Sequence, residues 1–217
     1  KTAHSNSRQR ETTMHKYIED TRFAAQSLID LIRNLTLEAE QNVQRLDNHK
    51  ESIKILSKLF MDTQFSERAM HDFIQLRKKI EETPQIEQDH ERYLAEYYWK
   101  YSAAEAISGA LLQIAKQGIS YKFTQLDRCK KKVRDIGSQP LQQVIWYARN
   151  QSMHYEDGAY DDGTEECFDK LVSDLGIEDF AVGAGKGKDS NLALRVVRLL
   201  GWDKYEQYEK DMIGLLG

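Results

Sequence analysis

The sequence predicts an all-α fold, in which a long N-terminal coiled-coil-like helix or helical pair is followed by a compact helical bundle. Only 2 Pro and 12 Gly occur in 217 residues, too few for the frequent turns of a β-sandwich or barrel. Hydrophobic residues make up 40% and charged residues 30% of the chain, a balance typical of folded, helix-rich domains. No run approaches the roughly 18 apolar residues of a membrane-spanning helix, so we expect no membrane partner.

The first predicted helix covers residues 14–60 and carries a coiled-coil-like seam. Asn42 and His49 are polar positions of this seam, and such residues fix helix register rather than do chemistry. Asp47 and Asn48 are helix-capping residue types, so the stretch is either one helix or a pair. A seam of this length predicts a homodimer, because a monomer need not cover the whole stripe. The seam positions alternate spacings of four and three residues: Met14, Ile18, Thr21, Ala25, Leu28, Ile32, Leu35, Ala39, Asn42, Leu46, His49, Ile53, Leu56 and Phe60.

A second helix is predicted over 66–82, with Ser66 as its N-cap. It ends at Thr83-Pro84, because the residue before a proline avoids helical backbone angles. We place a domain boundary there. Residues 1–84 are expected to form an elongated helical region, and residues 85–217 to form the bundle.

A third helix is predicted over 88–117 and ends at Gly118. A fourth is predicted over 121–136, with Cys129 turned toward the core as a small hydrophobic residue. The third helix carries an aromatic cluster that either stacks on RNA bases or belongs to the core or to a dimer interface: Tyr93, Tyr97, Tyr98, Trp99 and Tyr101.

The remaining elements are also helical. A fifth helix begins near Pro140, because proline suits a first helical turn. After a polar segment, a short helix closes at Gly176, and further helices are predicted over 190–200 and 203–216.

Charge is unevenly distributed, although the net charge is only −4. Residues 116–135 contain seven Lys or Arg and two Asp, whereas residues 155–180 contain ten Asp or Glu and one Lys. This asymmetry is typical of a protein with an anionic partner or of two segments that attract each other. The alternative is a pair of ordinary solvated segments.

We expect no cofactor and no bound metal. Cys129 and Cys167 are too few for a disulfide scaffold or a zinc site, and reduced thiols indicate a cytoplasmic protein. The glycine-rich stretch 183–188 does not match a phosphate-binding Walker loop, which needs Gly where Val182 stands and Ser or Thr where Asp189 stands.

The residues best suited to chemistry lie between Trp146 and Gly158. Arg149 is followed directly by Asn150, and four residues separate it from His154. This pattern resembles the R-x(4–6)-H motif of HEPN (higher eukaryotes and prokaryotes nucleotide-binding) domains, which often carry a polar residue directly after the arginine. The resemblance covers residues 88–175 and implies a HEPN-like helical bundle.

The resemblance also implies a function. Many HEPN proteins are metal-independent endoribonucleases of prokaryotic defence or toxin systems, and they act as homodimers that bring two motif copies into one cleft. The implied partners are RNA, a second copy of the chain, and an antitoxin or other defence-system subunit. Family members often add an acidic or polar residue from an earlier helix, and Glu105 is a candidate by position only.

The three motif residues suit this chemistry. RNA cleavage without metal needs a base that takes the proton of the ribose 2′-OH, and imidazole, with an ordinary pKa of about 6.5, serves near neutral pH. We therefore expect His154 to be the base, and Arg149 to stabilise the phosphate through its planar cation. Asn150 is expected to hydrogen-bond a phosphate or to orient the imidazole. On a continuous helix Arg149 and His154 lie about 140° apart, so they converge only where the helix bends or ends, or where two copies meet.

Two other functions remain open: a non-catalytic RNA- or nucleotide-binding module that assembles through the seam, and a coiled-coil adaptor unrelated to nucleic acid. The motif residues also have structural alternatives. Arg149 would form an ion pair with Glu156 or Asp157, and His154 would interact with the dipole at a helix C-terminus.

Overall fold

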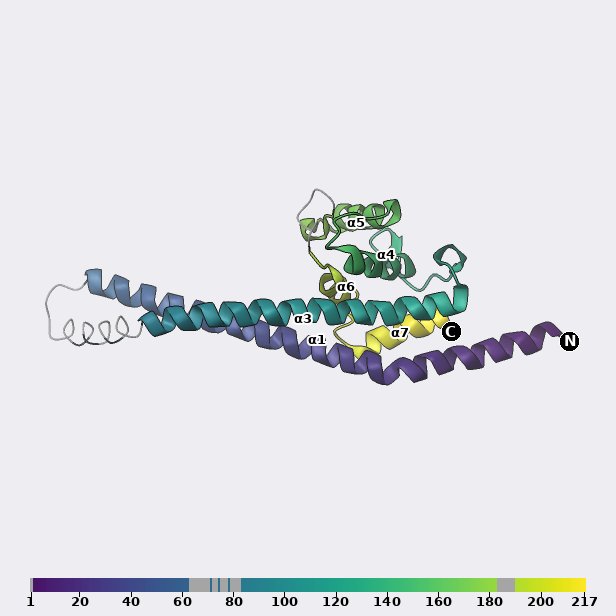
Figure 1. The fold of residues 1–217 in the computed structure, drawn as a ribbon, viewed down its shortest axis with the longest axis horizontal. Helices are drawn as coiled ribbons and strands as arrows, with labels where there is room; N and C mark the ends of the chain where they lie inside the picture. The colour runs from purple at the N-terminus through teal and green to yellow at the C-terminus, as the bar shows by residue number, and fades with distance from the viewer. Residues whose placement is uncertain (1, 63–70, 72–73, 75–77, 79–82, 183–189) are drawn as a thin grey trace. The chain divides into compact units, whose positions relative to one another are not determined.

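The computed structural model describes residues 2–62, 71, 74, 78, 83–182 and 190–217 (Figure 1). The described chain is helical apart from connecting segments and one two-stranded hairpin, which confirms the all-α prediction. The helix predicted over 66–82 lies outside the described residues except at positions 71, 74 and 78, and the glycine-rich stretch 183–188 lies wholly outside them.

The elements form two compact units, one made of residues 1–33 and 103–217 and the other of residues 34–102. The two longest helices pass through both units, so this division differs from the boundary predicted at residue 84.

In the described part of the chain, no helix combines the length and the apolar composition that crossing a bilayer requires. In chain order the elements are α1 (Thr2–Asp62), α3 (Thr83–Phe123), the 3-10 helix η1 (Leu126–Arg128), β1 (Asp135–Ile136), β2 (Gln139–Pro140), α4 (Leu141–His154), α5 (Asp162–Leu175), the 3-10 helix η2 (Glu178–Phe180), α6 (Ala193–Leu199) and α7 (Tyr205–Leu216).

The N-terminal seam forms largely as predicted. Helix α1 is one continuous helix that passes through Asp47 and Asn48 without a break. Seam positions of α1 that are buried are Ile18, Ala25, Ile32, Ala39, Asn42 and Leu46, and Ile29 and Thr36 are buried beside them. The side chains of five seam positions lie outside the described part: Met14, His49, Ile53, Leu56 and Phe60.

Within residues 34–102 the seam packs against the same chain. The Nδ2 atom of Asn42 donates to Oε2 of Glu96 at 3.3 Å, and Lys100 Nζ lies 2.9 Å from Glu38 Oε2. Residue numbers rise along α1 as they fall along α3 in these pairs, so the two helices are antiparallel. Helix α3 therefore covers this stretch of the seam, and this stretch by itself gives no reason for a dimer.

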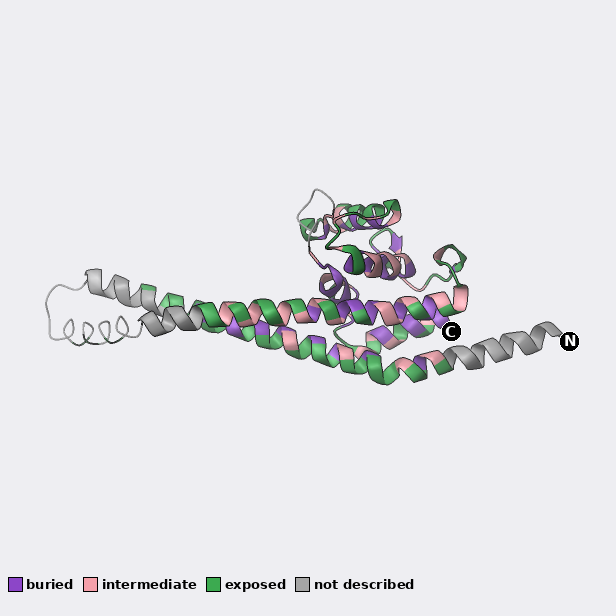
Figure 2. Ribbon diagram, in the orientation of Figure 1, coloured by how far each residue is buried: buried purple, intermediate pink, exposed green. Residues whose placement is uncertain are grey.

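The unit of residues 1–33 and 103–217 contains a closed helical core (Figure 2). Helix α4 contacts α5, α6, η1 and both strands, so it is central to this unit. Large side chains that are almost fully buried come from five helices and the α6–α7 connection: Ile29, Leu111, Leu112, Ile119, Leu141, Ile145, Phe168, Leu171, Leu194 and Trp202.

Gly118 does not end the third predicted helix, because α3 runs on to Phe123. A Cβ on Gly118 would lie 2.8 Å from Leu216 Cδ1 and 2.9 Å from Tyr17 Cε1. The glycine therefore serves a close approach of α1 and α7 to α3 rather than a C-cap. The predicted helix end at Gly118 relied on the conformational freedom of glycine. In the structure, the absence of a side chain is what matters, because it allows the close helix contact.

The helix predicted over 121–136 is wrong. After Phe123 the chain forms η1, an extended basic segment and the β1–β2 hairpin. Cys129 and Ile136 are buried as predicted, but the segment between them holds three consecutive lysines, Lys130 to Lys132. Arg128 and Lys131 would be like-charged neighbours on a helix, which disfavours the helical conformation.

The hairpin turn is built around Gly137. Its φ of 60° is one that L side chains rarely adopt, and a two-residue hairpin turn needs such an angle at its first central position. The Oδ2 atom of Asp174 accepts hydrogen bonds from Ser138 N and Oγ, both at 2.7 Å. These bonds hold the pKa of the Asp174 carboxyl below its usual value. The hairpin thus connects α5 to the start of α4.

Replacing Asp211 by Ala is expected to lower the free energy of unfolding by about 3 kcal/mol, because it leaves buried hydrogen-bonding groups without a partner. Asp211 is 1% exposed. It accepts from Arg134 Nη2 at 2.7 Å and from Trp202 Nε1 at 2.8 Å. Urea unfolding measures the change, and Glu206→Ala on the exposed side of α7 is the control, with an expected effect within about 0.5 kcal/mol. Equal effects of the two substitutions would contradict this role of Asp211.

Candidate functional site

The predicted motif occupies the C-terminal half of α4, and three features fix that half in place. Gly109 of α3 allows a close approach, since a Cβ there would lie 3.3 Å from Ser152 Oγ. Gln151 is fully buried. Its Nε2 donates to Ser190 O at 2.7 Å and its Oε1 accepts from Leu192 N at 2.9 Å. Gln151 is therefore a structural residue, and its neighbours in the motif are held on a rigid helix.

Arg149 points toward α3. Its Nε donates to Oε1 of Gln113, so the arginine is held by an amide rather than by the acidic partners Glu156 or Asp157 that sequence reasoning offered as an alternative. Within the described residues no hydrogen bond from its two terminal nitrogens is present, and the side chain is only half-buried. A planar cation held at Nε keeps its fork available for phosphate oxygens.

Asn150 joins a lysine to an aspartate. Lys116 Nζ donates to Asn150 Oδ1 at 2.7 Å, and Asn150 Nδ2 donates to Asp161 Oδ2 at 3.4 Å. The Lys116 ammonium also lies 4.3 Å from the centroid of the Trp146 ring, a cation–π distance. The amide of Asn150 is thus oriented by two charged neighbours, and among the described residues it forms no hydrogen bond with the imidazole of His154.

Lys116 lies next to a second cation. Burial and, to a smaller extent, the neighbouring Arg149 guanidinium lower the pKa of its ammonium, Asp161 partly opposes them, and the net result is a pKa of about 8. Two cations that disfavour each other gain when an anion binds between them. The pair Arg149 and Lys116 is therefore suited to a phosphate group.

His154 ends α4 and faces solvent. Its side chain is 57% exposed, and Nδ1 lies 3.2 Å from Oδ2 of Asp157. A carboxylate at Nδ1 favours the tautomer that carries its proton there, which leaves the lone pair on Nε2. The histidine is therefore accessible and oriented, and its specific partner is Asp157.

The structure does not bring Arg149 and His154 together in one chain. Helix α4 is continuous from Leu141 to His154, so the two side chains leave it about 140° apart. Arg149 contacts α3 and His154 contacts the turn after α4. Their convergence therefore requires a second copy of the chain.

Glu105 lies on α3 in the same unit. Burial raises the pKa of its carboxyl, and the nearby charge of Arg195 partly offsets the rise. Its electrostatic neighbours are Arg195 and Tyr155, the latter directly after His154. Glu105 is thus near the end of α4, but no hydrogen bond to a motif residue is present within the described part of the chain.

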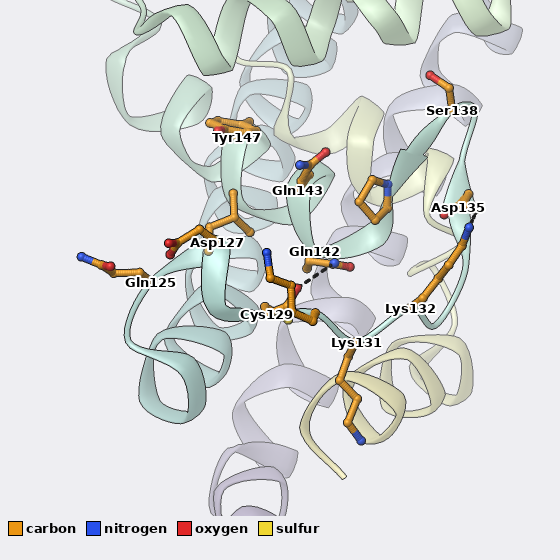
Figure 3. A pocket seen from close by; sticks show the side chains of 13 residues that line it. Gln125, Asp127, Cys129, Lys131, Lys132, Asp135, Ser138, Gln142, Gln143 and Tyr147 are labelled. Carbon is orange, nitrogen blue, oxygen red and sulfur yellow. Dashed lines mark hydrogen bonds and ion pairs between the residues drawn. The ribbon is translucent and has the colours of Figure 1, made fainter.

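A basic pocket lies at the other end of α4 (Figure 3). It has a volume of about 780 Å³. In Figure 3, Lys132 and Asp135 lie on one side and Gln125 and Asp127 on the other. The pocket is lined by Gln125, Leu126, Asp127, Cys129, Lys130, Lys131, Lys132, Asp135, Ser138, Pro140, Gln142, Gln143 and Tyr147.

The acidic segment 155–180 is held by contacts of its own. Asp161 caps α5, because its Oδ1 accepts from Thr164 N at 2.7 Å, and Asp157 and Asp174 bind His154 and Ser138. Across the described residues, no ion pair joins this segment to the lysines at 130–132. No residue of this segment is among those that line the basic pocket.

The two cysteines are buried and form no disulfide. Burial raises the pKa of the Cys167 thiol to about 12, which leaves it protonated and unreactive near neutral pH. Within the described part of the chain, no group of three or more His, Cys, Asp or Glu side chains is placed to hold a metal ion.

Sequence reasoning missed Lys116, Gln113 and Asp161. The signal for the first two was present, since both are polar and stand three residues apart in an otherwise apolar stretch of α3. Two such residues share a helix face. Nothing in the sequence indicated that this face meets Arg149 and Asn150, because that contact depends on how α3 packs on α4.

Comparison of the chain with protein-family models, with curated proteins and with solved structures finds no match. The function proposed below therefore rests on the motif and its surroundings.

The ammonium of Lys116 is expected to titrate with a midpoint near pH 8 in the folded protein. Its folded pKa lies below the ordinary value of 10.5, so the unfolded chain holds this proton over a range where the folded chain has lost it. From this residue alone, stability rises as the pH increases from about 8 to 10.5. Amine labelling over a pH series, read by mass spectrometry at Lys116, measures the midpoint.

Two variants check the cause of this shift. Arg149→Gln is expected to raise the Lys116 midpoint because it removes the neighbouring positive charge, and Asp161→Asn is expected to lower it because it removes the opposing negative charge. A wild-type midpoint near 10.5, or shifts of the opposite sign in the variants, would contradict the arrangement described here.

Proposed function

We propose that the chain is a HEPN-type, metal-independent endoribonuclease that cleaves RNA as a homodimer. The observation that carries this proposal is the state of the motif on α4. His154 is exposed and paired with Asp157, while Arg149 and Lys116 form a cation pair that faces away from it in the same chain. Attack by a ribose hydroxyl requires an oriented base beside a phosphate-binding group, so the base of one chain would act with the cation pair of a second copy.

In the proposed reaction, Nε2 of His154 removes the proton of the 2′-OH, and the 2′ oxygen forms a bond to the adjacent phosphorus. The bond from phosphorus to the 5′ oxygen breaks, and the 5′ oxygen takes a proton from solvent water, which leaves a 2′,3′-cyclic phosphate and a 5′-hydroxyl. The imidazolium then returns its proton to solvent. Asp157 stabilises the imidazolium that forms, and its distance of 3.2 Å from Nδ1 supports this role.

Arg149 and Lys116 stabilise the charge that develops on the phosphorane. Arg149 contributes its terminal nitrogens, since Gln113 occupies only Nε. Asn150 is held between Lys116 and Asp161, and it positions the lysine. DNA is not a substrate, because it lacks the 2′-OH that attacks.

The proposal includes a dimer because Arg149 and His154 diverge in one chain. A two-fold contact between the ends of two α4 helices would place two motif copies in one cleft. Light scattering at micromolar concentration is expected to show a dimer. A monomer that cleaves RNA would remove this part of the proposal.

From the resemblance, we place the activity in a cytoplasmic defence or toxin system of a prokaryote, with an antitoxin or another subunit of that system as a further partner. The second candidate function is a non-catalytic RNA-binding module. The divergence of Arg149 and His154 along α4 favours it, because a binding site does not need the two groups to converge.

Incubation of the purified protein with total RNA in EDTA separates these candidates. The proposal predicts cleavage of RNA and no cleavage of DNA of the same sequence. Binding that weakens with salt, without cleavage, would instead support the binding module. If the protein has no affinity for RNA at any salt concentration, the result would support the coiled-coil adaptor unrelated to nucleic acid.

A further inference from the structure

The basic pocket at the start of α4 contains an acceptor that its own chain does not satisfy. Gln142 is 6% exposed, and its Nε2 donates to Cys129 O at 3.2 Å. Its Oε1 is buried and accepts no hydrogen bond within the described residues. Buried polar atoms almost always have a partner, so this acceptor is left for a donor from water or from a bound molecule.

The pocket also carries positive charge. Lys130, Lys131 and Lys132 contribute to its lining. Lys132 is paired with Asp135 at 2.9 Å in an exposed ion pair, which is weak and readily exchanged. Among the described residues, the Lys130 ammonium has no hydrogen bond or ion pair. A ligand with both an anion and a hydrogen-bond donor fits this lining, and a nucleotide unit has both.

The face of α4 that lines the pocket also carries residues of the candidate site. Gln143 and Tyr147 line the pocket, and they are spaced by four residues. Asn150 and His154 follow at spacings of three and four, so all four side chains lie along one face of the helix. The rise from Tyr147 to His154 is about 10 Å, a span of a few nucleotides.

We propose that this pocket binds a segment of single-stranded RNA, with the backbone on Lys130 and Lys132 and a base against Gln142 and Gln143, and that the strand continues along α4 to Asn150 and His154. The inference rests on the proposed function for the identity of its substrate. A cavity of about 780 Å³ has the size of a small-ligand site, so an unstacked nucleotide enters it and a duplex does not.

Binding of a short fluorescent 2′-O-methyl RNA, followed by anisotropy over a salt series, tests this inference. The methylated 2′ oxygen cannot attack, so binding is read without cleavage. We expect Lys130→Gln/Lys132→Gln to weaken binding about tenfold and to reduce the salt slope by about two. Lys204→Gln/Lys210→Gln is the control, because these exposed lysines lie outside the pocket, and it is expected to bind like the wild type.

Three results would overturn the inference. The pocket variant could bind as tightly as the wild type, or the same oligonucleotide could bind equally well as a duplex. Adenosine monophosphate could also displace the probe at the same concentration as the unlabelled oligonucleotide does. Circular dichroism confirms that the variants fold. If the wild type binds through the lysines but never cleaves unmodified RNA, the pocket stands and the nuclease proposal fails. If RNA is cleaved but the lysine variant binds like the wild type, the pocket inference fails and the nuclease proposal stands.

Discussion

Replacing His154 by Ala is expected to reduce the kcat/KM for RNA cleavage by about 10²- to 10⁴-fold, because general base catalysis contributes a factor of that size. The melting temperature is expected to stay nearly unchanged, since the side chain is 57% exposed and its observed partner is the exposed Asp157. Initial rates on a single-stranded oligoribonucleotide, beside thermal unfolding by circular dichroism, measure both quantities.

Asp157→Asn is the matched control for His154. It keeps the shape at Nδ1 and removes the charge that stabilises the imidazolium, so it is expected to lower the rate less than His154→Ala does. A His154→Ala variant that cleaves at the wild-type rate would remove His154 from the reaction, and the activity would then belong to another site or to a contaminant.

Replacing Arg149 by Ala is expected to lower kcat by about 10²- to 10³-fold, the loss seen when one preorganised donor to a transition-state oxyanion is removed. Arg149→Lys keeps the charge but not the planar fork, so it is expected to recover only part of the rate. The same oligoribonucleotide assay measures each variant.

The Arg149→Ala/His154→Ala double variant is expected to lose less than the product of the two single losses, because the residues act in one step. Gln113→Ala is the control for positioning. It removes the hydrogen bond to Nε while it leaves the guanidinium in place, so its loss is expected to be smaller than that of Arg149→Ala. Full activity in Arg149→Ala would contradict the role assigned to the cation.

The helices were predictable where a single local pattern decided the outcome. The alternating spacing along α1 identified six of its buried residues between Ile18 and Leu46 but not Ile29 and Thr36, and the αL conformation at Gly176 ends α5 as expected. Gly118 shows the limit of that reasoning, because the same residue type serves a helix end or a close helix contact. Only tertiary packing distinguishes these uses.

The candidate site was predictable in part. The motif made Arg149, Asn150 and His154 candidates, and its expected position near a helix end is confirmed by α4. The partners Gln113, Lys116 and Asp161 come from segments that only the fold brings together. The basic pocket could not be predicted, because residues 121–136 were expected to form a helix. Their extended course after Phe123 is what places the lysines beside α4.

Analysis of the product ends tests the central claim most directly. A defined single-stranded RNA is incubated in EDTA with the purified protein and, in parallel, with His154→Ala purified in the same way. Cleavage by the wild type alone, with a 2′,3′-cyclic phosphate on one fragment and a 5′-hydroxyl on the other, is the result expected for attack by the ribose hydroxyl. Fragments with a 3′-hydroxyl and a 5′-phosphate, or intact RNA in both samples, would contradict it.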